Sequence, residues 1–334
     1  MGYQAEKNRI EKRIKRIKDI LLCVLLVALL GLCVFSAFVP PDSWKYHVGK
    51  PSLPRRKAGE LRIHFIDVGQ GDCTLVELPD GKVALIDGGD SQEGTEMKIL
   101  RHLNALRIDV IDYVIATHSD ADHCGGLQEV VAQKKVLNAY LPTTKPEKAC
   151  AEYVALYAEL MQEGCAISYS ERYLSLGNST SENGYIFTFL YPYASELNTG
   201  EETKNSNLES AVMWLDYHGV SALFAGDAPR LVEQYLMRDD KLGLFTSTGV
   251  RLTDTEILKV AHHGSADAST YEFLKYLQVE TAVISCGKNN TYGHPATEVK
   301  ENLTSVGASI YRTDQQGSIV ITITSDGRYS VANY

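Results

Sequence analysis

The sequence predicts one apolar helix followed along the chain by a mixed α/β (α+β) domain, in which two β-sheets pack together with helices outside them. Short β-branched runs separated by Gly-Gln-Gly-Asp and Pro-Asp-Gly turns begin the region after residue 60, as in an antiparallel meander, and a pair with an Asp-Gly turn closes it. Between these ends, strand-like and helix-like segments alternate. This order of segments favours two packed sheets with helices outside.

The first element is an uncharged apolar run, Ile20 to Val39, which is long enough to cross a bilayer as a helix. A cleaved signal peptide is the alternative, but its apolar region is normally shorter, and Ser36-Ala37-Phe38 lacks the small residue that a cleavage site needs. Seven Lys and Arg residues precede the run, so the positive-inside rule places the amino terminus in the cytoplasm. We therefore expect a single-pass protein of the cell membrane, with cytoplasmic residues 1–19, a transmembrane helix over 20–39, and the remainder outside.

The charge of the chain is divided unevenly. Residues 1–18 carry a net charge of +5, which leaves −14 for the rest of a chain whose total is −9. Such an acidic body does not attract nucleic acid by its overall field, so a polyanionic substrate would need local cations or bound metal ions. The proline- and lysine-rich residues 40–60 are expected to be a linker to a folded domain over residues 61–334.

The sequence of the folded region predicts a succession of short strands and helices. Strands are expected over 61–68, 73–79, 82–89, 109–118, 185–192, 210–218, 220–227, 257–264, 281–287 and in a closing pair within 317–334. Helices are expected over 97–106, 148–164, 229–239, 269–277 and 295–307, and directly after the motif Thr117–Gly126.

The motif Thr117–Gly126 (THSDADHCGG) carries the densest group of metal-binding residue types. It follows a strand and contains His118, Asp120, Asp122 and His123, followed by a glycine pair that allows a sharp turn. The alternative is a polar loop whose acids cap the next helix. Two histidines interleaved with the acids favour a metal site over a cap.

Further candidate ligands lie at the ends of other expected strands. These are Asp227, the adjacent His262 and His263, and His294 before a helix. Each of these residues alone could have a structural role instead. Asp227 could cap a helix, the histidine pair could be one buried and one solvated ring, and His294 could be a turn residue. Together they indicate one site, because side chains at strand exits can converge.

The order of IDGG, HSDADH, AGD and HHG resembles the metallo-β-lactamase superfamily. Within it, FIDVGQGD, SDADHCGG, the Asn207/Ser210 pair, FAGDA, LKVAHHGS and YGHP resemble the hydrolase domain of the ComEC/Rec2 competence proteins, over about residues 61–325. The resemblance implies a four-layer αββα sandwich.

The resemblance also implies roles for individual residues. His118 and Asp120 would bind a first metal ion, Asp122 and His123 a second, and Asp227 would bridge the two. One histidine of the 262/263 pair completes the second site. We favour His263, because neighbours on a strand point to opposite faces and His262 would then support it from outside. Asp87 is expected to orient the motif loop from below.

Two departures from the superfamily pattern bear on the metal. Asp120 stands where most members have histidine, and Asn207 stands roughly where a third histidine of the first ion would be. Oxygen ligands make that site harder and weaker. We therefore expect one or two divalent ions, manganese or zinc, with magnesium also compatible.

The expected activity is that of a membrane-anchored, metal-dependent extracytoplasmic phosphodiesterase, a nuclease acting on single-stranded DNA. Asp122 would accept the proton of the attacking water, and His294 would stabilise or protonate the leaving oxygen. The expected contacts to substrate or ligands are Ser210, Asn207, Lys288 and Asn289. A separate DNA-channel or uptake protein is a candidate partner.

Three alternatives stay open at this point. A phosphorylcholine or teichoic-acid type phosphoesterase of the cell envelope would suit a tethered domain. β-Lactam hydrolysis fits less well, because it usually uses a fuller set of histidines. A non-catalytic metal-binding surface module would be consistent with Asn207 in place of a ligand.

Overall fold

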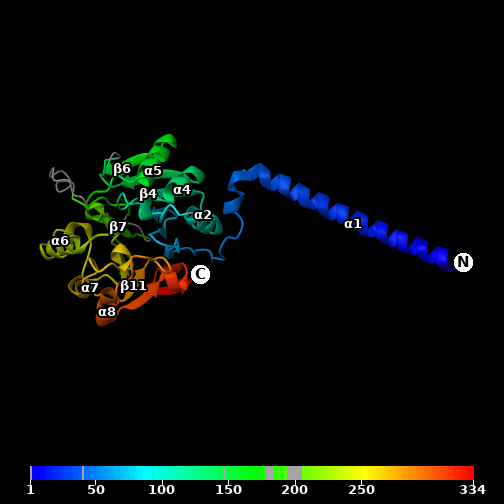
Figure 1. The fold of residues 1–334 in the computed structure, drawn as a ribbon. Helices are drawn as coiled ribbons and strands as arrows, with labels where there is room; N and C mark the ends of the chain where they lie inside the picture. Colours follow the sequence, from blue (N-terminus) through cyan, green and yellow to red (C-terminus); the bar gives the residue numbers. More distant parts are fainter. Residues whose placement is uncertain (1, 40, 93, 146–147, 178–183, 194–204) are drawn as a thin grey trace. The chain divides into compact units, whose positions relative to one another are not determined.

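The computed structural model describes residues 2–39, 41–92, 94–145, 148–177, 184–193 and 205–334 (Figure 1). The chain forms two units, Met1–Val48 and Gly49–Tyr334. The expected linker crosses this division, and its first residue, Pro40, lies outside the described residues.

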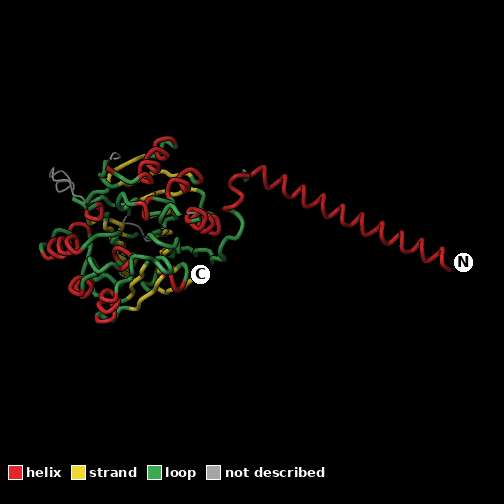
Figure 2. Tube along the Cα trace, viewed as in Figure 1, coloured by secondary structure: helices red, strands yellow, loops and turns green. Residues whose placement is uncertain are grey.

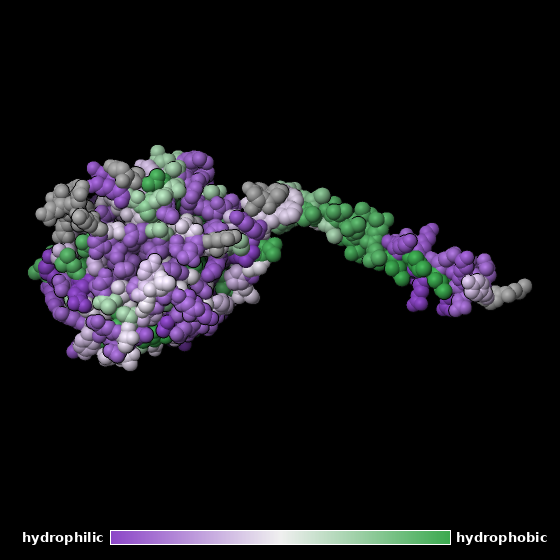
Figure 3. All heavy atoms as spheres, in the orientation of Figure 1, coloured by the Kyte–Doolittle hydropathy of each residue, from purple (hydrophilic) through white to green (hydrophobic). Residues whose placement is uncertain are grey.

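The N-terminal unit consists of the long helix α1 (Gly2–Phe38) and the short 3-10 helix η1 (Pro41–Tyr46). Its segment Glu6–Phe38 is long and apolar enough to cross a membrane, and the most apolar part of it is fully exposed. Figure 3 shows this part of α1 as a continuous hydrophobic surface next to a hydrophilic N-terminal end. The helix is therefore a candidate membrane span, and its orientation remains a prediction.

The second unit contains an eight-stranded sheet with the order β14-β13-β1-β2-β3-β4-β5-β6. Its strands are β1 (Leu61–Phe65), β2 (Thr74–Glu77), β3 (Val83–Ile86), β4 (Val110–Ile115), β5 (Lys135–Leu141), β6 (Ala166–Tyr169), β13 (Ile319–Ile323) and β14 (Tyr329–Asn333). Pairing is antiparallel from β14 to β3 and parallel from β3 to β6.

The other sheet has six strands in the order β12-β11-β10-β9-β8-β7. They are β7 (Ile186–Tyr191), β8 (Val212–Tyr217), β9 (Val220–Phe224), β10 (Ile257–Lys259), β11 (Thr281–Ile284) and β12 (Ser309–Arg312). The strands β7, β8 and β9 are antiparallel neighbours, whereas β9 to β12 run parallel.

Helices lie on the outer side of each sheet, while the strands occupy the interior (Figures 1 and 2). The first group is α2 (Thr95–Leu106), α3 (Ala121–Cys124), α4 (Leu127–Gln133) and α5 (Ala151–Gln162); the second is α6 (Arg230–Lys241), α7 (Tyr271–Leu277) and α8 (Thr297–Ser305), with a short α9 (Thr313–Gln316) before β13.

Alternation along β8 shows how the layers are built. Met213 and Leu215 join the core that contains residues of both sheets, whereas Val212 and Trp214 join the core that contains α6, α7 and α8 residues. Two sheets that share a core, with helices on their outer faces, confirm the expected αββα sandwich.

The strands β1, β2 and β3 are buried along their whole length, because each lies between the inter-sheet core and other chain segments. The strands β5, β6 and β12 were not predicted. The four residues of β6 and of β12 are all exposed or half-buried, so they carry little of the hydrophobic pattern that marks a strand.

A buried chain of polar side chains joins α2 to β1 and β2. Nε2 of His102 lies 3.0 Å from Nδ1 of His64, and Nε2 of His64 lies 2.9 Å from a carboxylate oxygen of Glu77. Arg62 lies 3.4 Å from the same oxygen. Burial lowers the pKa of His64 and lowers that of His102 further.

We predict that the domain loses stability as the pH falls below about 6.5, the ordinary histidine pKa. Below that pH the unfolded histidines bind protons that the folded ones do not, so the contribution is complete at higher pH and is lost on acidification. For each histidine, the free energy of unfolding falls by about 1.4 kcal/mol for every pH unit that separates its pKa in the folded chain from its pKa in the unfolded chain. Unfolding of the full chain in detergent at several pH values measures it, and His102→Asn should lose less stability on acidification than the unchanged chain. Equal losses would contradict the assignment.

Candidate metal centre

The candidate ligands come from the ends of strands in both sheets. The motif Thr117–Gly126 follows β4 and contains the short helix α3, Asp87 follows β3, Asp227 follows β9, and the histidine pair follows β10. Because β3 and β4 run parallel, as do β9 and β10, their carboxyl ends meet at one edge of each sheet.

Asp227 is the most central of these residues. Its side chain is almost completely buried, with Oδ1 3.2 Å from Nε2 of His123 and Oδ2 3.6 Å from Nε2 of His263 and 4.0 Å from Nε2 of His118. The backbone N–H of Asp227 donates to Oγ of Ser210, at 3.2 Å, which fixes the start of the loop. One carboxylate therefore faces imidazoles that follow strands of both sheets.

The two motif acids lie on different sides of this cluster. Asp122 has one carboxylate oxygen 3.2 Å from Nε2 of His263 and the other 4.0 Å from Nε2 of His123. Asp120 lies 3.6 Å from Nε2 of His118 and hydrogen-bonds Ser206. The structure thus separates a His118/Asp120 side from an Asp122/His123/His263 side, with Asp227 between them.

The ligand atoms fit a divalent cation. Nε2 of His118, Nε2 of His123 and Oδ1 of Asp227 are buried and have no hydrogen-bond partner in the part of the chain that the structure describes. Within the described residues, His118, His123 and Asp227 offer ligand atoms within 4.8 Å of one another, and so do Asp122, His123 and His263. Buried polar atoms without partners are costly, and a coordinated ion would satisfy them.

The charges of the cluster reinforce one another. Burial favours neutral imidazoles, but Asp227 and Asp87 raise the pKa of His123 above its ordinary value, and Asp227 and Asp72 raise that of His263 to about 10. Burial also opposes ionised carboxylates, yet the histidines lower the pKa of Asp122 and Asp227. Cation binding needs neutral histidines, so it would release protons from this cluster.

Asp87 supports the motif loop from below. Its carboxylate accepts hydrogen bonds from the backbone N–H and the hydroxyl of Thr117, each at 2.8 Å, and lies 2.8 Å from Nδ1 of His123. A carboxylate at Nδ1 fixes the ring and leaves Nε2 directed at the centre.

His262 and His263 were expected to lie on a strand over 257–264, and this expectation was wrong. The strand β10 ends at Lys259, and both histidines have left-handed backbone angles, with φ of 49° and 53°. This turn, rather than strand alternation, directs His263 into the centre. His262 is partly exposed, with Nδ1 3.0 Å from Asp267 and Nε2 3.6 Å from Asp227.

The glycine pair after the motif serves close packing rather than an unusual turn. Gly125 has φ of −56° and Gly126 φ of −83°, which other residues adopt readily. A Cβ on Gly125 would lie 2.2 Å from the backbone nitrogen of Ser91, and one on Gly126 would lie 2.4 Å from the carbonyl oxygen of Gly88. Glycine is therefore required because the loop after β3 contacts this backbone directly.

The remaining predicted residues lie further from the cluster. The His294 ring centroid is 5.5 Å from that of His262 and 6.2 Å from that of His263, its Nδ1 is buried without a partner, and burial lowers its pKa. Across the described residues, no hydrogen bond or ion pair links the side chains of Asn207, Lys288 or Asn289 to the cluster. Asn207 is nevertheless buried and adjoins Ser206, the partner of Asp120.

Sequence reasoning missed two residues that the structure brings to the centre. Asp72 and Lys259 are both buried, with Nζ of Lys259 2.6 Å from one Asp72 oxygen and the other oxygen 3.2 Å from Nδ1 of His263. Both residues stand inside motifs that carried the resemblance, FIDVGQGD and LKVAHHGS. Their motifs were the available signal, but their contact was not visible in either one.

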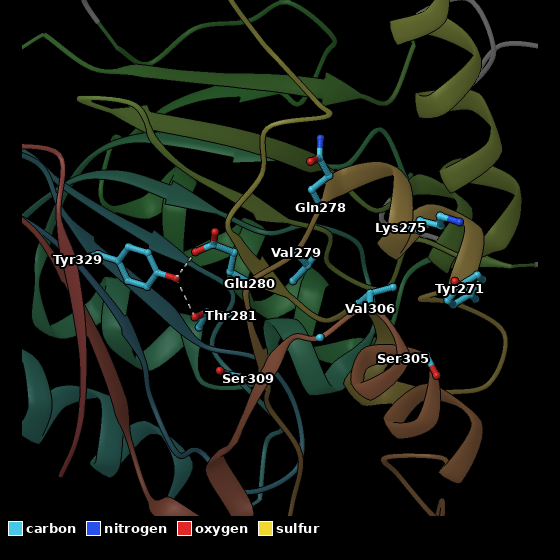
Figure 4. Close-up of a pocket in the computed structure, with 11 residues that line it drawn as sticks. Tyr271, Lys275, Gln278, Val279, Glu280, Thr281, Ser305, Val306, Ser309 and Tyr329 are labelled. Atoms are coloured by element: carbon cyan, nitrogen blue, oxygen red, sulfur yellow. Dashed lines mark hydrogen bonds between the residues drawn. The ribbon is translucent and has the colours of Figure 1, made fainter.

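A separate hollow of about 660 Å³ lies between α7, α8 and the adjoining strands (Figure 4). Its lining includes Lys275, Glu280 and Tyr329, and the Tyr329 hydroxyl donates to Glu280 at 3.2 Å. None of the candidate ligands lines it, so it is distinct from the cluster around Asp227.

The αββα sandwich with a His/Asp cluster at its strand ends is typical of metal-dependent hydrolases. The chain belongs to the metallo-β-lactamase superfamily, whose family model matches residues 66–288. Members of this superfamily are generally metal-dependent hydrolases, which agrees with the ligand atoms gathered here.

Two competence-related proteins are similar to this chain. ComE operon protein 3 of Bacillus subtilis is 30% identical over 277 residues, which cover 78% of this chain and 33% of that protein. Recombination protein 2 of Haemophilus influenzae is 26% identical over 271 residues, covering 79% of this chain and 29% of that protein. These similarities confirm the ComEC/Rec2 resemblance, and the chain spans about a third of the length of these relatives.

Among solved structures, Zn²⁺-bound PqqB from Methylobacterium extorquens is similar with a TM-score of 0.44 and 8% identity. The similarity covers 80% of this chain and 99% of that one.

Gly71 provides a direct test of how closely the loops at the centre approach. It has φ of 107°, and a Cβ there would lie 2.2 Å from the carbonyl oxygen of Asp122. Gly81 also has a positive φ, 92°, but open space around it, so it is a matched control. We predict that Gly81→Ala costs about 1–2 kcal/mol of folding free energy, whereas Gly71→Ala costs about 1–3 kcal/mol more and weakens metal binding.

Chemical unfolding and manganese titration of both variants measure these effects. The same loss of stability in both, with manganese binding intact in both, would show that the close approach of Gly71 to Asp122 has no consequence for the centre.

Proposed function

We propose that this chain is a membrane-anchored, metal-dependent phosphodiesterase that acts outside the cytoplasm and hydrolyses single-stranded DNA. The observation that carries the proposal is the cluster around Asp227, where a buried carboxylate faces Nε2 atoms of His118, His123 and His263. The proposed ligands are His118, Asp120 and Asp227 on one side, and Asp122, His123, His263 and Asp227 on the other.

Divalent ions in such a site lower the pKa of water and neutralise charge on a phosphoryl group. The chain would hold and orient the reactants around them. Asp122, whose pKa is lowered by His263 and His123, is ionised at neutral pH and can accept the proton of an attacking water. His294 carries a buried, unpartnered Nδ1 beside His262 and would donate a hydrogen bond to a phosphoryl or leaving oxygen.

Three carboxylates accompany three histidines among these ligands, and this share of oxygen ligands suits hard ions such as manganese or magnesium and also admits zinc. The similarity to ComE operon protein 3 and Recombination protein 2 supports DNA as the proposed substrate. A phosphoester of a cell-envelope polymer is a second candidate, because the candidate span in α1 would hold the domain beside such material. A separate channel or uptake protein would be the partner in the DNA case.

The full chain in detergent, stripped of metal and titrated with manganese, zinc and magnesium, provides the test. The substrates are labelled single-stranded DNA, bis-p-nitrophenyl phosphate and p-nitrophenylphosphorylcholine. We expect DNA cleavage that Asp227→Ala reduces by at least about 100-fold, since several kcal/mol of metal-dependent stabilisation are lost. Asp326→Ala, a change in the exposed turn before β14, is the control.

Outcomes other than DNA cleavage would favour the alternative functions. Cleavage of the choline ester without cleavage of DNA would favour the envelope polymer. No cleavage of any substrate with any of the three ions would overturn the enzymatic proposal and favour a metal-binding surface module.

His294 provides a second prediction. Replacing it with alanine should lower kcat for DNA by about 10²–10³-fold, the usual cost of removing a hydrogen-bond donor to a developing charge. Manganese affinity should stay the same, because His294 is outside the proposed ligand set. A loss of manganese binding in His294→Ala would instead show that His294 is itself a ligand.

A further inference from the structure

The position of His263 depends on what holds its second ring nitrogen. Nε2 faces Asp122 and Asp227, whereas Nδ1 lies 3.0 Å from the carbonyl oxygen of Ser285. Since a carbonyl only accepts, Nδ1 keeps its proton in the neutral ring, and Nε2 is then the nitrogen whose lone pair is available to a metal ion.

Asp72 contacts the same nitrogen from another direction. Its Oδ1 is buried and lies 3.2 Å from Nδ1 of His263, and among the described residues it has no other partner in hydrogen-bond geometry. Its Oδ2 lies 2.6 Å from Nζ of Lys259, which also donates to the carbonyl oxygen of Val260. One carboxylate therefore links an ammonium group to the ring of a proposed metal ligand.

The backbone fixes Asp72 as firmly as the ion pair does. Its N–H donates to the carbonyl oxygen of Asp122 at 3.2 Å, and its carbonyl oxygen accepts from the N–H of Gly89 at 2.7 Å. The preceding residue, Gly71, has no space for a Cβ beside Asp122. The loop between β1 and β2 is thereby attached to the proposed ligand loop itself.

The buried Asp72–Lys259 ion pair is not explained by a contribution to the stability of the fold. Asp72 and Lys259 are 3% and 2% exposed, and a buried ion pair costs about as much in desolvation as it gains in attraction. What the pair does provide is a link between sheets: Lys259 ends β10 of the six-stranded sheet, and Asp72 precedes β2 of the eight-stranded sheet. His263 lies at that junction.

We propose that the Asp72–Lys259 ion pair is a positioning element for the metal centre, which fixes the ring of His263 through Nδ1. Lys259 balances the charge of Asp72, so that this carboxylate supports the histidine rather than adding to the proposed ligands. The inference rests on the proposed function, because it requires that His263 bind a metal ion.

The test removes both charges together, since removing one would leave an unpaired buried charge and destabilise the fold. The double variant Asp72→Asn/Lys259→Met, as the full chain in detergent, is titrated with Mn²⁺ and Co²⁺. We expect a 10–100-fold weaker affinity for both ions, the usual effect of losing an outer partner of a ligand, and a changed Co²⁺ absorption spectrum. Its unfolding temperature should remain close to that of the unchanged chain.

The control is the same exchange in another buried ion pair, Arg62→Met/Glu77→Gln. Arg62 and Glu77 lie 3.4 Å apart, on β1 and β2, and contact none of the proposed ligands. This variant should keep the affinity and the spectrum of the unchanged chain even if it is less stable. An equal loss of affinity in the control would overturn the proposal, because it would show a general effect of destabilisation.

Two results separate this inference from the proposed function. Unchanged affinity and spectrum in the folded Asp72→Asn/Lys259→Met variant would overturn the positioning role alone. Failure of the unchanged chain to bind Mn²⁺ or Co²⁺ would overturn both.

Discussion

The burial of the Asp227 carboxylate among the imidazoles of His118, His123, His262 and His263 is the constraint on which the rest of this structure depends. Asp227 is 2% exposed, and its two oxygens face Nε2 of His123 and Nε2 of His263. Without a metal ion, protonated histidines can balance the charge of the carboxylates. This attraction raises the pKa of His123 and His263 and lowers that of Asp227, although burial opposes both shifts. A divalent cation satisfies the same atoms without protonating the rings.

The cluster requires loops from both sheets to approach one another closely. Glycine permits this where backbones meet: Gly71 against the carbonyl of Asp122, and Gly125 and Gly126 against the loop after β3. Lys259 supplies a positive charge within this packing, where its ammonium group lies against Asp72. The loops at the strand ends therefore have two roles. They carry the proposed ligands, and their close packing sets the direction in which each imidazole points.

Much of the fold could be predicted from the sequence, because the hydrophobic runs and turns mark most strands and the motifs mark the strand ends. The candidate ligands of the HSDADH motif could be located for the same reason. The left-handed turn at His262 and His263 could not, since nothing in LKVAHHGS distinguishes a turn from a continued strand. The contact of Asp72 with Lys259 joins distant segments and depends on the packing of the two sheets, which no local pattern encodes.

If the cluster around Asp227 is a divalent metal centre, the full chain should retain metal after equilibrium dialysis against manganese or zinc. Elemental mass spectrometry of the unchanged chain and of Asp227→Ala measures this most directly. We expect at least about one tightly bound ion per unchanged chain, and loss of that ion in the variant, because Asp227 lies between both groups of ligands. Equal metal content in the two proteins, or none in either, would contradict this assignment.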